Sequence, residues 1–561
     1  MATCILRGSL VCGVIACMAG LMAGGCMNNP YGGRDRVGTL SLPVDEVRGL
    51  FVATAYNIDW PSQPGLDTPE QQQAQKDEID TIVQRAVDLG FNTIFLQVRA
   101  FGDRIYSEHT SGRPWIKSIP WAWSLNYGWP PGDEGYDPLK EWICRCHANG
   151  LQIFAWMNPY RTDQPISYDY QGVTTQLPCY WSNDGHMYMD ETSDAVQDYL
   201  WNVVDDLVTA YQTCDCPQSN GGGGGDGDDG GDEGGNRGYQ PAMATTTTTG
   251  GDDDGLDGVV VDHYFPDPEL GVLSMAAGSA PMMMMLDAPG SQVPALPPRP
   301  YTPKKQTTID ATIAGLFERV SGKGRIFAIS PLDNQRGLSH AHVGDWLAQG
   351  KCHYFMPEIY TRGLLDFKRS LNYWNNLNTG GKPRPTVVPV LFTTAVMKKV
   401  DKGKLWSAKE IENEVRWAQA MRMGQAHYGV QALQSERRGG PSDNVGDLLK
   451  SGAYKTKALI PEVTIAPKYK QEKGIADEVP APTVRSGVGW ASAKSNSKVP
   501  IRVWAYQLKR RDGTWGDLQT APGGKSRRIS ISWFAKGVRV MSVDRYGRKS
   551  KWVEPPSEPK K

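Results

Sequence analysis

The segment Gly258–Asp262 places three valines in a row directly before a carboxylate. An apolar run of this kind is typical of a strand that is buried on both faces of a parallel sheet. A second segment, Tyr354–Glu358, also ends in a carboxylate, and in both cases a tyrosine follows two residues later. Because parallel α/β proteins carry their chemistry at the carboxyl ends of the strands, we expect Asp262 and Glu358 to lie at one rim of such a sheet.

Eight segments with strand character lie between residues 50 and 434, and most of them alternate with segments of helical periodicity. This alternation predicts an α/β fold, a (β/α)8 TIM barrel. The predicted strands are Leu50–Ala55, Thr93–Val98, Leu151–Met157, Gly258–Asp262, Arg325–Ser330, Tyr354–Glu358, Thr386–Leu391 and Gly429–Leu433. The predicted helices are Pro69–Leu89, Leu139–Asn149, Thr192–Tyr211, Ile309–Val320, Val343–Ala348, Phe367–Leu377 and Ala408–Met423.

The length of 561 residues exceeds that of a single ordinary domain. We expect the barrel at residues 44–466, interrupted by flexible low-complexity insertions at 214–255 and 271–305. A small fibronectin type III-like β-sandwich is expected at residues 478–555. Its predicted strands are Ile501–Leu508, Arg528–Trp533 and Val538–Val543.

Residues 1–26 have the pattern of an export signal, with Arg7 before an apolar stretch too short for a comfortable membrane span. The small residues that end in Cys26 resemble the lipobox of bacterial lipoproteins, although an ordinary secretory signal is the alternative. Residues 27–43 form a linker in this interpretation. We therefore expect a protein of the bacterial cell envelope that is anchored to a membrane through a lipid on Cys26, on the periplasmic or surface side.

A formal net charge of -1 gives no reason to expect a nucleic-acid partner. Lys and Arg outnumber Asp and Glu after Glu478, which suits either a solvated β-module or contact with an anionic surface. Six cysteines follow Cys26, and an exported protein can form disulfides whose pairing the sequence does not determine. No motif requires a metal or another cofactor, and we expect none.

Polar and aromatic residues gather where several predicted strands end. Aromatic rings stack on the apolar faces of sugars, while amide, carboxylate and guanidinium groups bind sugar hydroxyls. For a single residue there is an equally good local account, such as a turn capped by Asp59 or an ion pair made by Arg99. As a set, the residues predicted to bind substrate are Asp59, Trp60, Gln97, Arg99, Asp103, Trp156, Asn158, Tyr160, Arg161, His263, Tyr264 and Tyr360.

Hydrolysis of a glycoside needs two carboxyl groups, one to protonate the leaving oxygen and one to attack or to activate water. Asp262 and Glu358 are the predicted catalytic pair. An acid beside an aromatic wall has its pKa raised, which favours Glu358 as the acid and Asp262 as the nucleophile or base. The chain has no Gly-x-Ser-x-Gly elbow and no phosphate-binding glycine loop after a strand, which disfavours a serine hydrolase and a nucleotide site.

The same segments resemble glycosyl hydrolase-like family 10 over roughly Val44 to Pro461, without the two insertions. The resemblance implies a TIM barrel in an envelope lipoprotein, often with a fibronectin-like tail, and a hydrolase that acts on glycans such as peptidoglycan strands stripped of peptides. The motifs that carry it are Glu46–Val52, Tyr56–Pro61, Gly90–Arg99, Gly135–Leu139, Ala155–Arg161, Asp257–Pro266, Ile329–Pro331 and Pro357–Tyr360.

The chain departs from the family pattern at two positions. His263 stands where the family usually has a second aspartate, and Glu358 stands where it usually has glutamine. If relatives do not use the second position, Asp103 or another carboxylate at this rim is the alternative partner of Asp262. The first departure motivates a different function, a non-catalytic glycan-binding envelope lipoprotein, and a third hypothesis is a scaffold with a blocked cleft.

Overall fold

A computed structural model describes most of the chain from Val44 onward. The described ranges are 44–107, 119–126, 136–162, 164–170, 173–181, 186–214, 216, 254–262, 307–333, 342–377, 379–397, 405–433, 444–532 and 534–556. Cys26, His263, Tyr264 and nearly all of the predicted insertions lie outside these ranges. Among the described residues, no helix combines the length and the apolar character that a membrane crossing requires.

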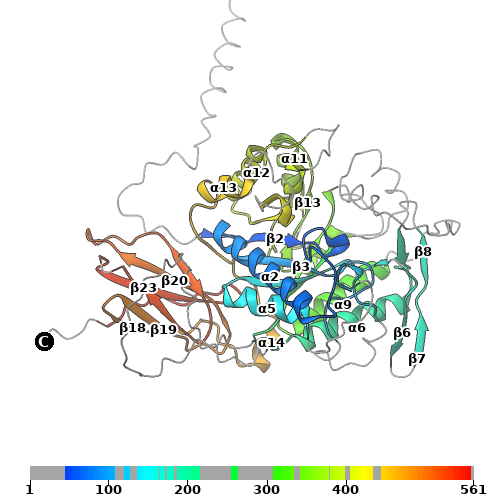
Figure 1. The fold of residues 1–561 in the computed structure, drawn as a ribbon, viewed down its shortest axis with the longest axis horizontal. Coiled ribbons are helices and arrows are strands. Elements are labelled where there is room, and N and C mark those ends of the chain that lie inside the picture. Colours follow the sequence, from blue (N-terminus) through cyan, green and yellow to red (C-terminus); the bar gives the residue numbers. More distant parts are fainter. Residues whose placement is uncertain are drawn as a thin grey trace, which may run out of the picture. The chain divides into compact units, whose positions relative to one another are not determined.

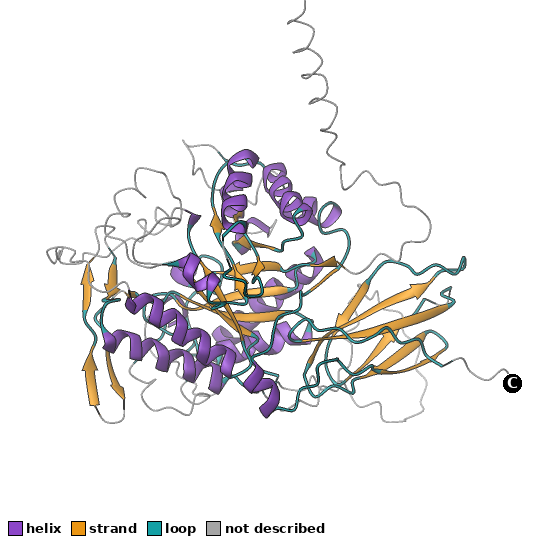
Figure 2. Cartoon of the chain, turned by 180° about the vertical axis from the view of Figure 1, so that it is seen from behind, coloured by secondary structure: helices purple, strands orange, loops and turns teal. Residues whose placement is uncertain are grey.

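Ten strands form one parallel sheet that closes on itself (Figures 1 and 2). Its strands are β2 (Arg48–Val52), β3 (Thr93–Arg99), β4 (Gln152–Met157), β10 (Gly258–Asp262), β11 (Ile326–Ser330), β12 (Tyr354–Phe355), β13 (Glu358–Ile359), β14 (Thr386–Val387), β15 (Val390–Phe392) and β16 (Gln425–Tyr428). All neighbouring strands pair in parallel. From β2 to β12 each strand pairs with the next, β12 pairs with β14, β13 pairs with β15, and β15 pairs with β16, which returns to β2. The predicted TIM-barrel-like α/β fold is confirmed.

Two of the predicted strands are each divided into two by a proline. Pro357 separates β12 from β13, and Pro389 separates β14 from β15. A proline has no N–H for the ladder, so the regular pairing stops at that residue. The backbone contacts nevertheless continue, because Val390 N–H donates to the Pro357 carbonyl at 2.9 Å. Each divided strand therefore occupies a single strand position in the barrel.

Helices follow the strands and lie outside them (Figure 2). They are α2 (Pro69–Leu89), α5 (Pro138–Ala148), α6 (Asp194–Ala210), α9 (Thr307–Gly322), α10 (Val343–Ala348), α11 (Leu364–Asn375), α12 (Ala408–Ala420) and α13 (Val445–Ser451). The start of α2 follows the local signals, because Thr68 accepts from the Gln71 N–H and the Gln71 side chain reaches back in a capping box. Gly90 ends this helix in the left-handed conformation, with φ of 90°.

The prediction for the eighth strand was wrong. The strand is β16 (Gln425–Tyr428), and the predicted segment Gly429–Leu433 contains a 3-10 turn, η5 (Val430–Leu433). Gln425 and His427 made β16 look unlike a buried strand. Both side chains are fully buried and contact the Tyr454 hydroxyl, at 2.8 and 2.9 Å. A partner that is distant in sequence thus satisfies the polar groups that obscured the strand.

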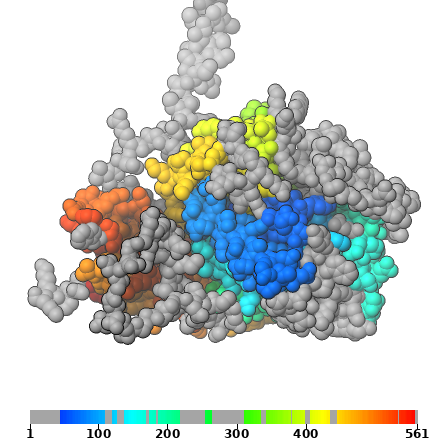
Figure 3. Space-filling model, viewed as in Figure 1, coloured from blue at the N-terminus to red at the C-terminus, as the bar shows by residue number. Residues whose placement is uncertain are grey.

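Contacts between helices α2 and α13, and the pairing of the short strands β1 (Val44–Asp45) and β17 (Ala458–Leu459), also link the first and last parts of the barrel. Arg85 of α2 donates to the Leu433 carbonyl at 3.0 Å, and α13 packs on α2. In Figure 3 the blue segment that contains α2 and the yellow segment that contains α13 lie side by side.

The remaining short elements are η1 (Ala55–Asn57), α4 (Trp123–Asn126), β5 (Arg161–Thr162), β6 (Ser167–Tyr170), β7 (Val173–Gln176), β8 (Cys179–Trp181), β9 (Met187–Met189), η4 (Thr393–Val396) and α14 (Pro467–Glu472).

The C-terminal module consists of two antiparallel sheets of three strands each. The strands are β18 (Thr483–Gly487), β19 (Trp490–Lys494), β20 (Ile501–Lys509), β21 (Gln519–Pro522), β22 (Ser526–Ser530) and β23 (Gly537–Asp544). Residues of both sheets, including Ala491, Ile529, Trp504 and Val540, share one buried cluster. The predicted strands Ile501–Leu508 and Val538–Val543 are present as β20 and β23, whereas the strand predicted at Arg528–Trp533 lies earlier, as β22. The fibronectin type III-like assignment stays a prediction.

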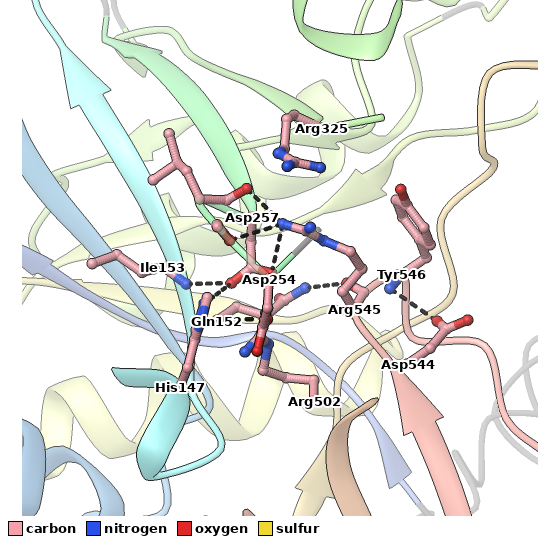
Figure 4. Close-up of polar contacts among 12 residues, drawn as sticks. His147, Gln152, Ile153, Asp254, Asp257, Arg325, Arg502, Asp544, Arg545 and Tyr546 are labelled. Carbon is pink, nitrogen blue, oxygen red and sulfur yellow. Dashed lines mark hydrogen bonds and ion pairs between the residues drawn. The ribbon is translucent and has the colours of Figure 1, made fainter. Parts of the chain in front are cut away.

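A buried ionic network joins this module to the amino-terminal rim of the barrel (Figure 4). Asp257, which directly precedes β10, is fully buried and contacts Arg502 at 2.8 Å and Arg545 at 3.3 Å. The same carboxylate accepts from the Ile153 N–H at 2.9 Å and contacts Nε2 of His147 at 3.0 Å. These contacts hold the module against the rim opposite Asp262.

Candidate active site

Alternation along the strands directs the catalytic candidates into the barrel. Phe95, Phe154 and Val260 belong to one buried cluster that fills the interior. Because side chains two residues apart on a strand share a face, Gln97 and Asp262 point into the same space one layer higher. The apolar layer forms the floor, and the polar layer above it lies at the carboxyl rim.

Asp262 lies in a chain of hydrogen bonds that spans three neighbouring strands. Its Oδ2 accepts from the Trp156 indole N–H at 3.0 Å and from the Asn158 amide at 3.4 Å. Gln97 donates to Oδ1 of Asn158 at 2.8 Å. The oxygen of Gln97 accepts from the backbone N–H groups of Thr54 and Ala55, at 3.0 and 2.9 Å. The network thus fixes the orientation of a carboxylate that is 4% exposed.

Glu358 faces the same opening from β13 and is also 4% exposed. Its Oε1 lies 3.0 Å from the hydroxyl oxygen of Ser330 on β11. Ser330 is paired directly with Asp262 in the register of β10 and β11. The strand that carries Ser330 therefore separates the two predicted catalytic carboxylates, and the three side chains line one arc of the rim.

Tyr428 at the end of β16 faces both predicted catalytic carboxylates. Burial raises the pKa of Tyr428 above its usual range. The negative charges of Asp59, Asp262 and Glu358 raise it further, and the positive charge of Arg161 acts in the opposite direction. These electrostatic interactions show that the groups, which come from different parts of the sequence, lie close to one another.

Aromatic rings complete the wall around this opening. The Tyr428 ring lies 6.2 Å from that of Trp156 and 6.3 Å from those of Tyr360 and Phe392, measured between centroids. Tyr360 also packs on Phe392 at 5.1 Å. Rings beside paired carboxylates are the combination expected for a sugar-binding cleft.

Two further predicted residues hold the rim together. Asp59 accepts from the backbone N–H groups of Ala53, at 2.9 Å, and Gln431, at 3.2 Å. Arg161 lies over the Phe101 ring, with 4.6 Å between the guanidinium carbon and the centroid. Asp59 therefore caps a turn, as the local account of this residue expected, while it also contributes negative charge to the opening.

Four predicted binding residues lie away from the opening, in the layer between strands and helices. Trp60 is fully buried and donates to the Gln75 carbonyl of α2 at 3.1 Å. Tyr160 packs in the same outer core, and its hydroxyl interacts with Thr312 of α9. Because these side chains pack on helices, we assign them to the support of the barrel.

Arg99 and Asp103 are the other two predicted binding residues that lie away from Asp262 and Glu358. Arg99 donates to the Tyr199 hydroxyl of α6 at 2.9 Å, beyond a register shift that turns it away from Gln97. Burial raises the pKa of Asp103, and its Oδ1 accepts from the N–H groups of Ala100 and Phe101. The carboxylate of Asp103 thus organises a turn, which weakens it as the alternative second catalytic carboxylate.

Ser330, Phe392 and Tyr428 are site residues that sequence reasoning missed. Tyr428 lay just outside the misplaced eighth strand, and correct placement of that strand would have found it. Ser330 lies in the quoted motif Ile329–Pro331, but its short side chain gave no sign of chemistry.

One cysteine cluster offers atoms that suit a metal. The sulfur atoms of Cys144, Cys214 and Cys216 lie within 4.8 Å of one another. Cys144 and Cys216 form a disulfide, and the Cys214 sulfur lies 3.7 Å from that of Cys144. Because thiolates bind metals and disulfides do not, this pairing leaves no three-thiolate set.

The closed parallel barrel, with carboxylates and aromatic rings at its carboxyl rim, defines a TIM-barrel-like α/β protein. Residues 46–217 match the family Glycosyl hydrolase-like 10. The resemblance that the sequence motifs indicated is therefore confirmed over this segment.

Curated relatives of this chain include two proteins that are both named as glycosyl hydrolases. The chain is 28% identical to "Glycosyl hydrolase DigH" of Escherichia coli (strain K12) over 205 residues, which are 33% of this chain and 44% of the relative. It is 34% identical to "Glycosyl hydrolase YngK" of Bacillus subtilis (strain 168) over 116 residues, which are 21% of this chain and 20% of that relative. The chain thus spans less than half the length of the curated relatives that it matches.

Solved structures with detectable similarity include an alpha-amylase from Lactobacillus plantarum. The two chains are 12% identical, with a TM-score of 0.35, and the match covers 87% of this chain and 99% of the other. A TM-score this low does not support the fold assignment, which therefore depends on the strand order of this chain.

Proposed function

We propose that this protein is an exported, lipid-anchored glycoside hydrolase of the bacterial cell envelope, with peptidoglycan glycan strands as its substrate. The observation that carries the catalytic part is the placement of Asp262 and Glu358 on one arc of the barrel rim, beside Tyr428 and Trp156. The signal-like pattern of residues 1–26, which ends in Cys26, supports the proposed location in the envelope and the proposed lipid anchor.

The two carboxyl groups take different roles in this proposal. Two N–H donors on one oxygen of Asp262 favour its ionised form, which suits a nucleophile or a base that activates water. Glu358 has a hydroxyl neighbour and lies beside aromatic rings, which suits the acid that protonates the leaving oxygen. The chain Gln97–Asn158–Asp262 keeps the attacking group oriented while the sugar stacks on the rings.

Digestion of purified, peptide-stripped peptidoglycan strands tests the proposal. We expect the wild type to shorten the strands, and Asp262→Asn and Glu358→Gln each to lower kcat by about 100-fold or more. Asp517→Asn on the C-terminal module is the matched control and keeps full activity, because Asp517 is exposed.

Three other results would change the assignment. Activity that persists in Glu358→Gln but is lost in folded Asp103→Asn would make Asp103 the second carboxylate. A wild type that binds the glycan without cleaving it would identify a glycan-binding lipoprotein, the alternative that His263 motivates. A wild type that neither binds nor cleaves these strands would exclude peptidoglycan as the substrate.

A further inference from the structure

The ladder between β11 and the divided strand β12–β13 lacks one donor. Met356 N–H donates to the Ile329 carbonyl and Glu358 N–H donates to the Pro331 carbonyl, both at 2.8 Å. In a parallel ladder with these two bonds, the carbonyl of Met356 takes its hydrogen from residue 331. That residue is a proline and has no N–H to donate.

Ser330 supplies the missing donor. Its hydroxyl oxygen lies 2.9 Å from the Met356 carbonyl oxygen and 3.0 Å from Oε1 of Glu358. A hydroxyl has a single hydrogen to give, and a carbonyl oxygen can only accept. Because Met356 is fully buried, its carbonyl needs this hydrogen to avoid the cost of an unsatisfied polar group.

Because Ser330 donates its hydrogen to Met356, its contact with Glu358 depends on whether Glu358 is protonated. Once the hydrogen points at Met356, the hydroxyl oxygen presents lone pairs to Glu358. Two acceptors 3.0 Å apart repel each other, whereas a protonated carboxyl group can donate to the hydroxyl. The short contact is therefore a hydrogen bond when Glu358 carries a proton.

We propose that Ser330 is a positioning residue that holds Glu358 in its protonated form and orients that proton. The catalytic use of the proton rests on the proposed function. In that step the proton moves to the glycosidic oxygen, and the bond from this oxygen to the anomeric carbon breaks. The electron pair stays on the oxygen, so the sugar leaves as an alcohol and Glu358 becomes a carboxylate. The anomeric carbon gains its new bond from Asp262, or from a water that Asp262 deprotonates.

Among the described residues, other charged and titratable groups lie close to Tyr428 and Glu358. Asp59 and Asp262 add negative charge at Tyr428, on which Glu358 also acts. Arg161 acts in the opposite direction, and Tyr428 stays neutral because burial raises its pKa. Tyr360 contributes a second phenol beside Tyr428. Negative charge in this region favours a protonated carboxyl group, which is the same direction as the effect proposed for the Ser330 hydroxyl.

The test measures the pKa of Glu358 directly in the full-length protein. Carbon-13 NMR of glutamate labelled at the side-chain carboxyl carbon gives the titration curve, and Glu358→Gln identifies the resonance. We expect Ser330→Ala to lower this pKa by about one unit, because the protonated form loses its acceptor. Ser330→Thr keeps the hydroxyl and should stay near the wild type. Ser321→Ala is the matched control, since Ser321 bonds to Phe317 within α9.

The direction of the shift distinguishes the two states of the contact. A rise in the pKa of Glu358 in Ser330→Ala would show that the hydroxyl donates to a carboxylate, and it would overturn the proposal, as would an unchanged pKa. Pro331→Ala gives an independent test, also if Ser330→Ala does not fold. It restores an N–H at position 331 that can satisfy Met356, so the released hydroxyl donates to Glu358 and the pKa falls.

The pH dependence of glycan cleavage separates this inference from the proposed function. In an active enzyme the basic limb of the kcat profile should move to lower pH in Ser330→Ala and in Pro331→Ala. If the wild type cleaves no glycan but the NMR shifts appear, the inference stands and the hydrolase proposal fails. If cleavage occurs while the pKa of Glu358 does not respond to either substitution, the inference fails alone.

Discussion

Replacement of Asp257 by asparagine removes the more deeply buried of two negative charges in the network that joins the barrel to the C-terminal module, the other being Asp254, which contacts Arg502 at 3.0 Å. Asp257 and the two arginines that it contacts, Arg502 and Arg545, are each at most 1% exposed. Asparagine has nearly the same shape, but it replaces the carboxylate that Arg502 and Arg545 share by a neutral amide, while Asp254 stays beside Arg502. Loss of one partner from a buried ion pair typically costs about 3–5 kcal/mol. We therefore expect Asp257→Asn to lower the free energy of unfolding by this amount.

Urea unfolding, followed by circular dichroism and by tryptophan fluorescence, measures this loss. Asp517→Asn is the matched control, because Asp517 forms an exposed pair with Arg510 at 3.7 Å and should change stability by less than about 1 kcal/mol. The reasoning would be refuted if Asp257→Asn destabilised the protein no more than Asp517→Asn does. Such a result would mean that the arginines find other partners when the carboxylate is absent.

The pH dependence of the same difference has a defined sign. Burial alone would raise the pKa of Asp257, but the charges of Arg502 and His147 hold it well below the usual range. A lowered pKa stabilises the fold above the ordinary carboxyl pKa of about 4, and this contribution is lost as the pH falls through the folded-state value. The gap between wild type and Asp257→Asn should thus persist at pH 5 and shrink only in stronger acid.

Three further substitutions test other parts of the structure. Within the described residues Glu414 is fully buried, neither carboxyl oxygen has a hydrogen-bond partner, and burial raises its pKa well above the usual range. Glu414→Leu should therefore raise the free energy of unfolding by about 1–3 kcal/mol at pH 8, and by less at pH 4, in urea titrations. Trp156→Phe removes an N–H donor from Asp262 and should lower kcat/KM about 10- to 100-fold in glycan digestion; an unchanged value would contradict the role of this hydrogen bond. Thr68→Ala should cost about 1 kcal/mol in unfolding experiments and Thr68→Ser almost nothing, unless the capping box is unimportant.

Elements with local signals were predictable from the sequence. The strand Gly258–Asp262 and the helix Pro69–Leu89 have the predicted bounds, because an apolar run, a cap and a terminal glycine act over a few residues. The position of Asp262 at the end of β10 was predictable for the same reason, whereas Glu358 begins the short strand β13 after Pro357. The eighth strand was not, since the hydroxyl that satisfies Gln425 and His427 belongs to Tyr454.

The direction of side chains beyond the strand ends depended on the tertiary structure. In the sequence, Gln97 and Arg99 are equally good candidates for the binding site. A register shift between them directs Gln97 toward Asn158 and Asp262, and Arg99 toward Tyr199 of α6. The role of Ser330 likewise appears only when the pairing of β11 with β12 places Pro331 opposite a carbonyl that lacks its donor.

By itself, the sequence determined the alternation of strands and helices, their caps, and the acidic residues at two strand ends. These features depend on interactions between neighbours along the chain. Only the tertiary structure decided which rim residues face one opening, and which residues hold the C-terminal module to the barrel. Asp257 is separated by 245 residues from Arg502 and by 288 from Arg545. Contacts across such separations depend on strand register and on the packing of whole layers, which no short segment of the chain encodes.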